Sequence, residues 1–116
     1  EAIDLAKKYN GSITLLHVHW DHGATTTYDG IEVRDQASIK LYKDVETELK
    51  SSGVKYMLHS ENDPNAPDVI LSTAKRENID TIVIGSRGMG GARAWLLGSV
   101  SSKVAAEAQC PVIIVK

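Results

Sequence analysis

The first thirty residues alternate between helical and extended patterns. In residues 1–9, apolar side chains recur at the spacing of one helix face, and Asn10-Gly11 follows as a helix stop. Residues 12–20 form a short, mainly apolar run, which is typical of a strand buried on both faces. Residues 22–30 are rich in Thr and Gly, and we interpret them as a loop.

The same alternation continues to the end of the chain. Residues 32–52 carry apolar side chains four apart, with charged residues between them, which predicts an amphipathic helix. The further elements that the pattern predicts are a strand at 54–59, a turn at 62–67 leading into a helix that ends near Asn78, a strand at 81–84, a helix from an N-cap at Ser99 to Ala108, and a last strand at 111–115.

This order of elements specifies a mainly parallel sheet with helices on both faces. The chain starts with a helix, whereas a right-handed βαβ chain opens with a strand. We therefore expect a single domain, residues 1–116, with an α/β, flavodoxin-like three-layer fold. Its sheet would have five strands, of which the first, central strand is absent from this sequence.

Composition narrows the classes of partner and compartment. Hydrophobic residues make up 42% and charged residues 24% of the 116 residues, as in soluble globular proteins with a core. Thirteen basic and fifteen acidic side chains give a net charge of −2, so neither nucleic acid nor a membrane is expected as a partner. The single cysteine, Cys110, cannot form an internal disulfide, and no signal peptide or long apolar span is visible, which predicts a cytoplasmic protein.

The segment from Gly85 to Ser101 carries the candidate chemistry, because it follows a buried strand directly. In parallel sheets, ligands bind beyond the carboxyl ends of the strands, and the N-terminus of the next helix offers free N–H groups to an anion. Gly85 and Gly88 would let the backbone approach a phosphate, and Gly98 would turn the chain. Ser99 and Ser101 would bring hydroxyl donors to the helix start.

The same glycines could serve loop geometry alone, since a glycine-rich loop is a weak signal by itself. A P-loop is excluded because Gly91 stands where that motif needs lysine. Arg93 at the third glycine position of G-x-G-x-x-G argues against a dinucleotide fold.

The spacing of the glycines, G-x2-G-x9-G-S, resembles the loop of ATP-binding universal stress proteins. The resemblance covers essentially the whole chain: Leu15–Val18 looks like the second strand of that family, Asp80–Gly88 like the fourth, and Cys110–Val115 like the closing strand. It implies ATP as the ligand, with Mg²⁺. The loop glycines would hold the phosphates and ribose, the Ser-Val-Ser segment would cap the triphosphate, and Val18 would contact adenine through its backbone. The residues that receive these roles are Val18, Gly85, Arg87, Gly88, Gly98, Ser99, Val100 and Ser101.

The resemblance also bears on the strand that the pattern lacks. In the family this strand lies between those matched by residues 12–20 and 81–84, and it ends in an aspartate that helps to hold the nucleotide. No residue of this sequence matches that aspartate. We expect the two flanking strands not to pair with each other, and the gap to be filled by a strand outside this numbering or from a neighbour.

The function that these features favour is a nucleotide-dependent stress-response or regulatory module. No G-x-S-x-G or Cys-His arrangement points to catalysis. Two alternatives stay open: an interaction module of the same fold that binds no nucleotide, and a slow ATPase.

The remaining candidate residues are best interpreted as structural. His17, His19 and His22 are close in sequence, but structural histidines are favoured over a metal site. We interpret Cys110 as a small core residue and residues 95–97 as packing rather than a partner-binding patch.

The closing strand, 111–115, predicts a homodimer. As the last strand of this topology it has one neighbour, and its apolar run has no internal charge, proline or glycine to block edge pairing. We expect it to pair antiparallel with its copy, as relatives of the family do.

Overall fold

The computed structural model describes residues 2–19, 26–28, 31–33, 36–86 and 98–115. The chain divides into two compact units, Glu1–Pro64 and Asn65–Lys116.

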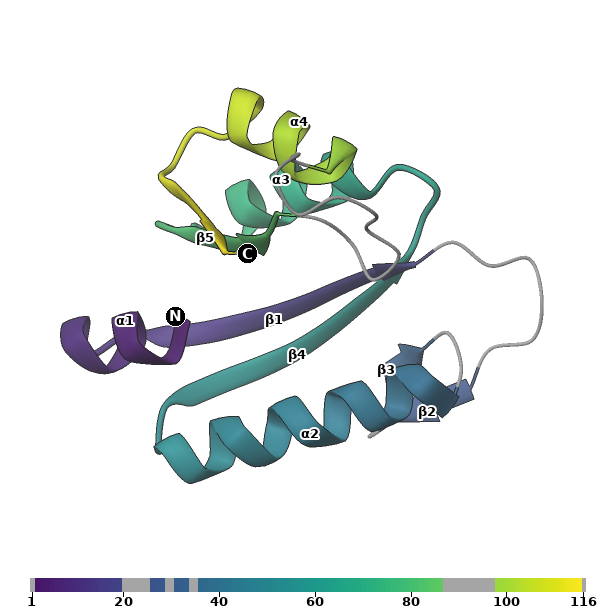
Figure 1. Ribbon diagram of the computed structural model, residues 1–116, viewed down its shortest axis with the longest axis vertical. Coiled ribbons are helices and arrows are strands. Elements are labelled where there is room, and N and C mark those ends of the chain that lie inside the picture. The colour runs from purple at the N-terminus through teal and green to yellow at the C-terminus, as the bar shows by residue number, and fades with distance from the viewer. Residues whose placement is uncertain (1, 20–25, 29–30, 34–35, 87–97, 116) are drawn as a thin grey trace. The chain divides into compact units, whose positions relative to one another are not determined.

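The first unit is built on two parallel strands. β1 (Ser12–His19) and β4 (Lys55–Asn62) pair along their full length, from Ser12 opposite Lys55 to His19 opposite Asn62 (Figure 1). The helices α1 (Ala2–Tyr9) and α2 (Gln36–Ser52) precede the two strands in the chain. This helix-before-strand order in parallel pairing is what the sequence pattern predicts.

Both helices of this unit end in a left-handed residue. Asn10 follows α1 at a φ of 56°, and Gly11 donates its N–H to the Ala6 carbonyl at 2.8 Å. Gly53 follows α2 at a φ of 76°, a conformation that glycine adopts at low cost. These turns lead each helix directly into its strand.

The expected loop at 22–30 is wrong in part, because β2 (Thr26–Tyr28) and β3 (Ile31–Val33) form an antiparallel pair. The helix predicted from residue 32 begins at Gln36 instead. Thr, Tyr, Ile and Val favour strands, and Asp29-Gly30 between the two strands is a sequence signal for a hairpin. The abundance of polar residues and glycine in this region hides the signal.

The core of the first unit lies where α2 packs against the sheet. Tyr42 and Leu49 of α2 are buried, and so is Glu46 between them. The Tyr56 hydroxyl donates to Glu46 Oε2 at 2.7 Å, and the His17 ring lies edge-on to Tyr42 at 5.8 Å. The buried Glu46 carboxylate of α2 is therefore paired with a hydroxyl of β4.

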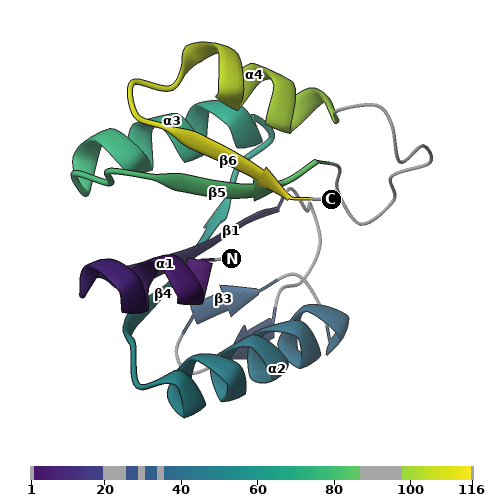
Figure 2. The same ribbon diagram turned by 60° about the vertical axis from the view of Figure 1, so that its left-hand side comes forward.

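The second unit repeats the parallel arrangement. β5 (Ile82–Gly85) pairs with β6 (Val112–Val115), with Ile82 opposite Val112. α3 (Ala66–Arg76) and α4 (Ser99–Glu107) pack against each other on one side of this strand pair (Figure 2). Val104 of α4 is completely buried, and Ile82 of β5 is buried as well.

Several helices and strands begin or end at other residues than the sequence predicts. The strand expected at 54–59 continues to Asn62, and the helix expected to reach Asn78 ends at Arg76. The N-cap of α4 is Gly98 rather than Ser99. Ser99 is thus already the first helical residue.

The parallel pairs confirm an α/β architecture, in sheets of two strands each among the described residues. Among these residues β1 pairs with β4 in the first unit, and β5 pairs with β6 in the second. The five-stranded sheet stays a prediction. In the part of the chain described here, no helix is long and apolar enough to span a bilayer.

Candidate functional site

The carboxyl ends of β5 and β6 meet the start of α4 at Ser86. The Ser86 N–H donates to the Val115 carbonyl at 2.7 Å, which extends the strand pairing by one bond. The Ser86 carbonyl accepts the Gly98 N–H at 2.5 Å. The end of β5 and the beginning of α4 are therefore held together, although they are distant in sequence.

A buried hydroxyl reinforces this junction. Ser101 is 2% exposed, and its hydroxyl lies 2.9 Å from the Ser86 carbonyl oxygen and 3.1 Å from the Gly98 carbonyl oxygen, so its single proton is shared between these two acceptors, with Ser86 the nearer. Ser86 is also buried, and its own hydroxyl has no hydrogen-bond partner among the described residues.

The N-terminus of α4 has no side-chain cap from the described residues. Gly98 occupies the N-cap with a φ of −66° and a ψ of 159°, a residue with no side chain that could cap the helix. The first N–H groups of a helix have no carbonyl partner within it, and the helix dipole adds partial positive charge at the same end. Ser99 is exposed and Val100 is half-buried. The arrangement is suited to an anion such as a phosphate.

The structure brings together part of the predicted set. Gly98, Ser99, Val100 and Ser101 form the start of α4, and Gly85 is the exposed last residue of β5. Arg87 and Gly88 lie outside the described residues. Val18 belongs to the first unit, where it is half-buried and opposite Glu61 in the β1–β4 register.

Sequence reasoning misses Ser86, because a serine that follows Gly85 in a glycine-rich segment is interpreted only as part of the loop. The position of Ser86 directly after β5 is a signal that could have identified it, since the first residue beyond a strand can continue the strand pairing and turn toward the next helix. The Ser86 N–H continues the pairing by its bond to Val115, and the Ser86 carbonyl connects to the helix start by its bond to Gly98.

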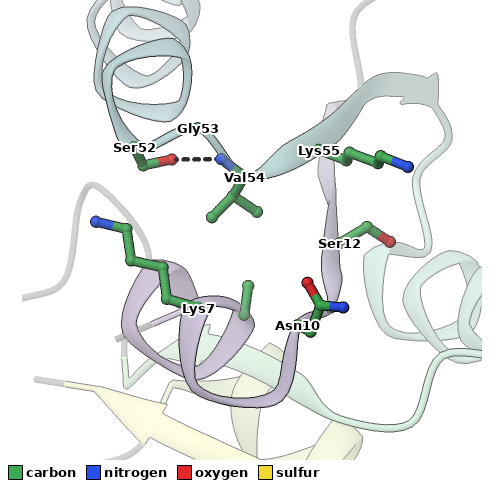
Figure 3. A pocket seen from close by; sticks show the side chains of 9 residues that line it. Lys7, Asn10, Ser12, Ser52, Gly53, Val54 and Lys55 are labelled. Carbon is green, nitrogen blue, oxygen red and sulfur yellow. Dashed lines mark hydrogen bonds between the residues drawn. The ribbon is translucent and has the colours of Figure 1, made fainter.

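A polar pocket of about 570 Å³ lies in the first unit, at the amino ends of β1 and β4 (Figure 3). Lys7 and Lys55 point in opposite directions there. The Ser52 hydroxyl accepts the Val54 N–H at 3.2 Å and donates to the Leu49 carbonyl at 2.6 Å. Because the lysines diverge and helix ends present carbonyl groups to this pocket, it lacks converging donors for an anion.

A second pocket, of about 490 Å³, lies in the second unit between α3, β5 and the end of α4. Ile79, Ile82 and Cys110 contribute to its lining. Cys110 is a free, half-buried thiol, in a position consistent with its interpretation as a small packing residue.

The histidines of β1 do not form a metal centre with described residues. Among these residues, no three His, Cys, Asp or Glu side chains are close enough to share a metal ion. The His17 ring packs edge-on against Tyr42, whereas the His19 side chain and all of His22 lie outside the described part.

Comparison with known proteins covers the whole chain. The family model described as "Universal stress protein family" matches residues 1–116. The chain is 32% identical over 128 residues to the universal stress protein YxiE of Bacillus subtilis, with 99% of this chain and 86% of that protein covered.

Solved structures give the same result for the fold. A universal stress protein from Archaeoglobus fulgidus in complex with dAMP has a TM-score of 0.65 at 21% identity, over 99% of this chain and 82% of that one. A universal stress protein in complex with cAMP has a TM-score of 0.69 at 18% identity, over 98% and 80%. At these identities the likeness concerns the fold. By the match along its full length, the chain belongs to the universal stress protein family.

Proposed function

We propose that this protein binds ATP with Mg²⁺, as the ligand of a cytoplasmic stress-response or regulatory module. The observation that carries the proposal is the start of α4. No side chain of the described residues caps its N–H groups, and they lie next to the carboxyl end of β5, where parallel α/β proteins bind ligands.

Two further observations support a nucleotide. Proteins of the same fold hold dAMP and cAMP in solved structures, so this fold accommodates adenine nucleotides. The glycine spacing of residues 85–99 resembles that of ATP-binding relatives, which favours a triphosphate. Contacts from Gly85, Arg87 and Gly88 to the phosphates, and from Val18 to adenine, belong to this proposal.

The proposal can be tested at Gly98, where an acidic side chain would occupy the helix N-terminus. Asp is favoured at N-caps, so Gly98→Asp should leave the free energy of unfolding unchanged or raise it. The same carboxylate would take the N–H groups and repel phosphate. We expect ATP affinity to fall more than about tenfold in calorimetric titration with Mg²⁺, and the unmodified protein to prefer ATP over GTP.

Ser102→Asp is the matched control, because it adds the same charge to an exposed position of the same helix. It should retain ATP binding. An unmodified protein that binds ATP and GTP equally, or neither, would overturn the proposed ligand. If Gly98→Asp bound ATP with unchanged affinity, the phosphate would not bind at the start of α4.

We further propose a homodimer through β6. The Ile82 N–H donates to the Pro111 carbonyl, and the Ser86 N–H to the Val115 carbonyl. Because bonding alternates along a parallel strand, the N–H and C=O groups of Val112 and Ile114 point away from β5. Among the described residues β6 pairs with β5 alone, so these outward groups are available to a second copy.

A further inference from the structure

Four groups from three residues meet at the start of α4 and form what we call the Ser86–Ser101 clasp. They are the Ser101 hydroxyl, the Ser86 carbonyl, and the backbone N–H and C=O of Gly98. The Ser86 carbonyl accepts two hydrogen bonds, one from the Gly98 N–H and one from the Ser101 hydroxyl. Both lone pairs of this oxygen are therefore used.

Part of the clasp is ordinary helix chemistry. A serine in the first turn of a helix commonly bonds a carbonyl three or four residues earlier, and the contact from Ser101 to Gly98 is of this local kind. The bond to Ser86 is different, because it spans fifteen residues of sequence and connects the helix to the end of β5. Helix formation by itself does not require it.

Burial makes the non-local bond effective. Ser101 is 2% exposed and Ser86 is 5% exposed, so little water competes for these groups. Ser86 is in turn bonded through its N–H to Val115 at the end of β6. The first turn of α4 is thus connected by hydrogen bonds to the carboxyl ends of both strands of this unit.

We propose that Ser101 is a positioning residue for the phosphate site, a role that rests on the proposed function. Its hydroxyl points inward and holds α4 at the end of β5, so that the N–H groups of Ser99 and Val100 stand in place before the nucleotide arrives. A site that is ordered in advance loses less conformational entropy on binding. Loss of the clasp then weakens binding even though no phosphate contact is removed.

The test compares Ser101→Ala with Ser102→Ala, which removes an exposed hydroxyl from the neighbouring position of the same helix. Ser101→Ala should weaken ATP binding about tenfold, the effect of losing one buried hydrogen bond. Ser102→Ala should bind as the unmodified protein does. Ser101→Thr keeps the hydroxyl and should restore most of the affinity.

A second measurement uses the protein without nucleotide. The Gly98 amide donates to the Ser86 carbonyl, so its hydrogen exchange reports on the clasp directly. Exchange of this amide should become at least about tenfold faster in Ser101→Ala and stay unchanged in Ser102→Ala.

The outcomes separate this proposal from the proposed function. If the unmodified protein binds no ATP but Ser101→Ala still accelerates exchange at Gly98, the clasp exists and the ligand is wrong. If ATP binds and Ser101→Ala binds equally well, the positioning role is overturned. Weak binding by both Ser101→Ala and a folded Ser101→Thr would also contradict a role for the hydroxyl.

Discussion

Tyr42 is a residue whose burial has a measurable consequence at high pH. It is 2% exposed, and its hydroxyl donates to the His59 carbonyl at 3.3 Å. Burial raises the pKa of Tyr42 above the ordinary value of 10.0, and a hydrogen bond with Ser60 opposes part of this shift. A raised folded-state pKa gives stability that is complete below pH 10.0 and is lost as pH rises through the folded-state pKa.

We therefore predict that the free energy of unfolding falls as pH increases above 10.0, and falls less steeply in Tyr42→Phe. At neutral pH the same substitution should cost about 1 kcal/mol, because the His59 carbonyl loses its donor. Urea unfolding at a series of pH values measures the pH dependence of the free energy of unfolding and the cost of the substitution at neutral pH. Tyr9→Phe is the control, because Tyr9 is exposed. Equal slopes for the two variants would contradict the prediction.

At the scale of the element, α3 begins with a side-chain cap that α4 lacks. Asn65 Oδ1 accepts the Asp68 N–H at 3.3 Å, and Asn65 Nδ2 donates to Asp68 Oδ2 at 2.8 Å. Asn65→Ala should lower the free energy of unfolding by about 1 kcal/mol, whereas Asn65→Ser retains an acceptor and should lower it much less. Chemical denaturation of the three proteins measures the difference. If alanine and serine had the same effect, the cap would not stabilise the fold.

The contrast between these two helix starts has a functional meaning. Asn65 satisfies a donor of α3 from within the protein. Gly98 has no side chain with which to do this for α4. Of these two helices, the one without a side-chain cap from the described residues follows the carboxyl end of β5, which is where the proposed phosphate would bind.

At the scale of the whole molecule, the proposed dimer depends on two outward N–H groups of β6. Ile114→Pro removes one of them without breaking a bond to β5, so it should convert dimers to monomers. Ile114→Val keeps the N–H and should remain dimeric. Analytical sedimentation measures the oligomeric state, and circular dichroism shows whether both variants are folded.

The dimer proposal would fail in either of two ways. The unmodified protein could already be monomeric at micromolar concentration. Alternatively, the dimer could survive both Ile114→Pro and Val112→Pro, which together remove the outward N–H groups of the strand.

The sequence by itself determined most of the elements and their parallel arrangement. Apolar periodicity and turn residues are local signals, so they predicted β1, β5, β6 and the helices to within a few residues. They failed for β2 and β3, where short β-branched segments were hidden in a polar region. The glycine spacing placed the candidate site after β5, because the resemblance to a family carries information that periodicity does not.

The tertiary structure alone decided how the site is built. The sequence predicts a hydroxyl donor at Ser101, and the structure adds that this hydroxyl is buried and lies 2.9 Å from the Ser86 carbonyl oxygen. The importance of Ser86 and the capping position of Gly98 were equally invisible in the sequence. The physical reason is that hydrogen bonds between residues far apart in sequence depend on how a strand end and a helix start meet, and no local pattern of side chains records that geometry.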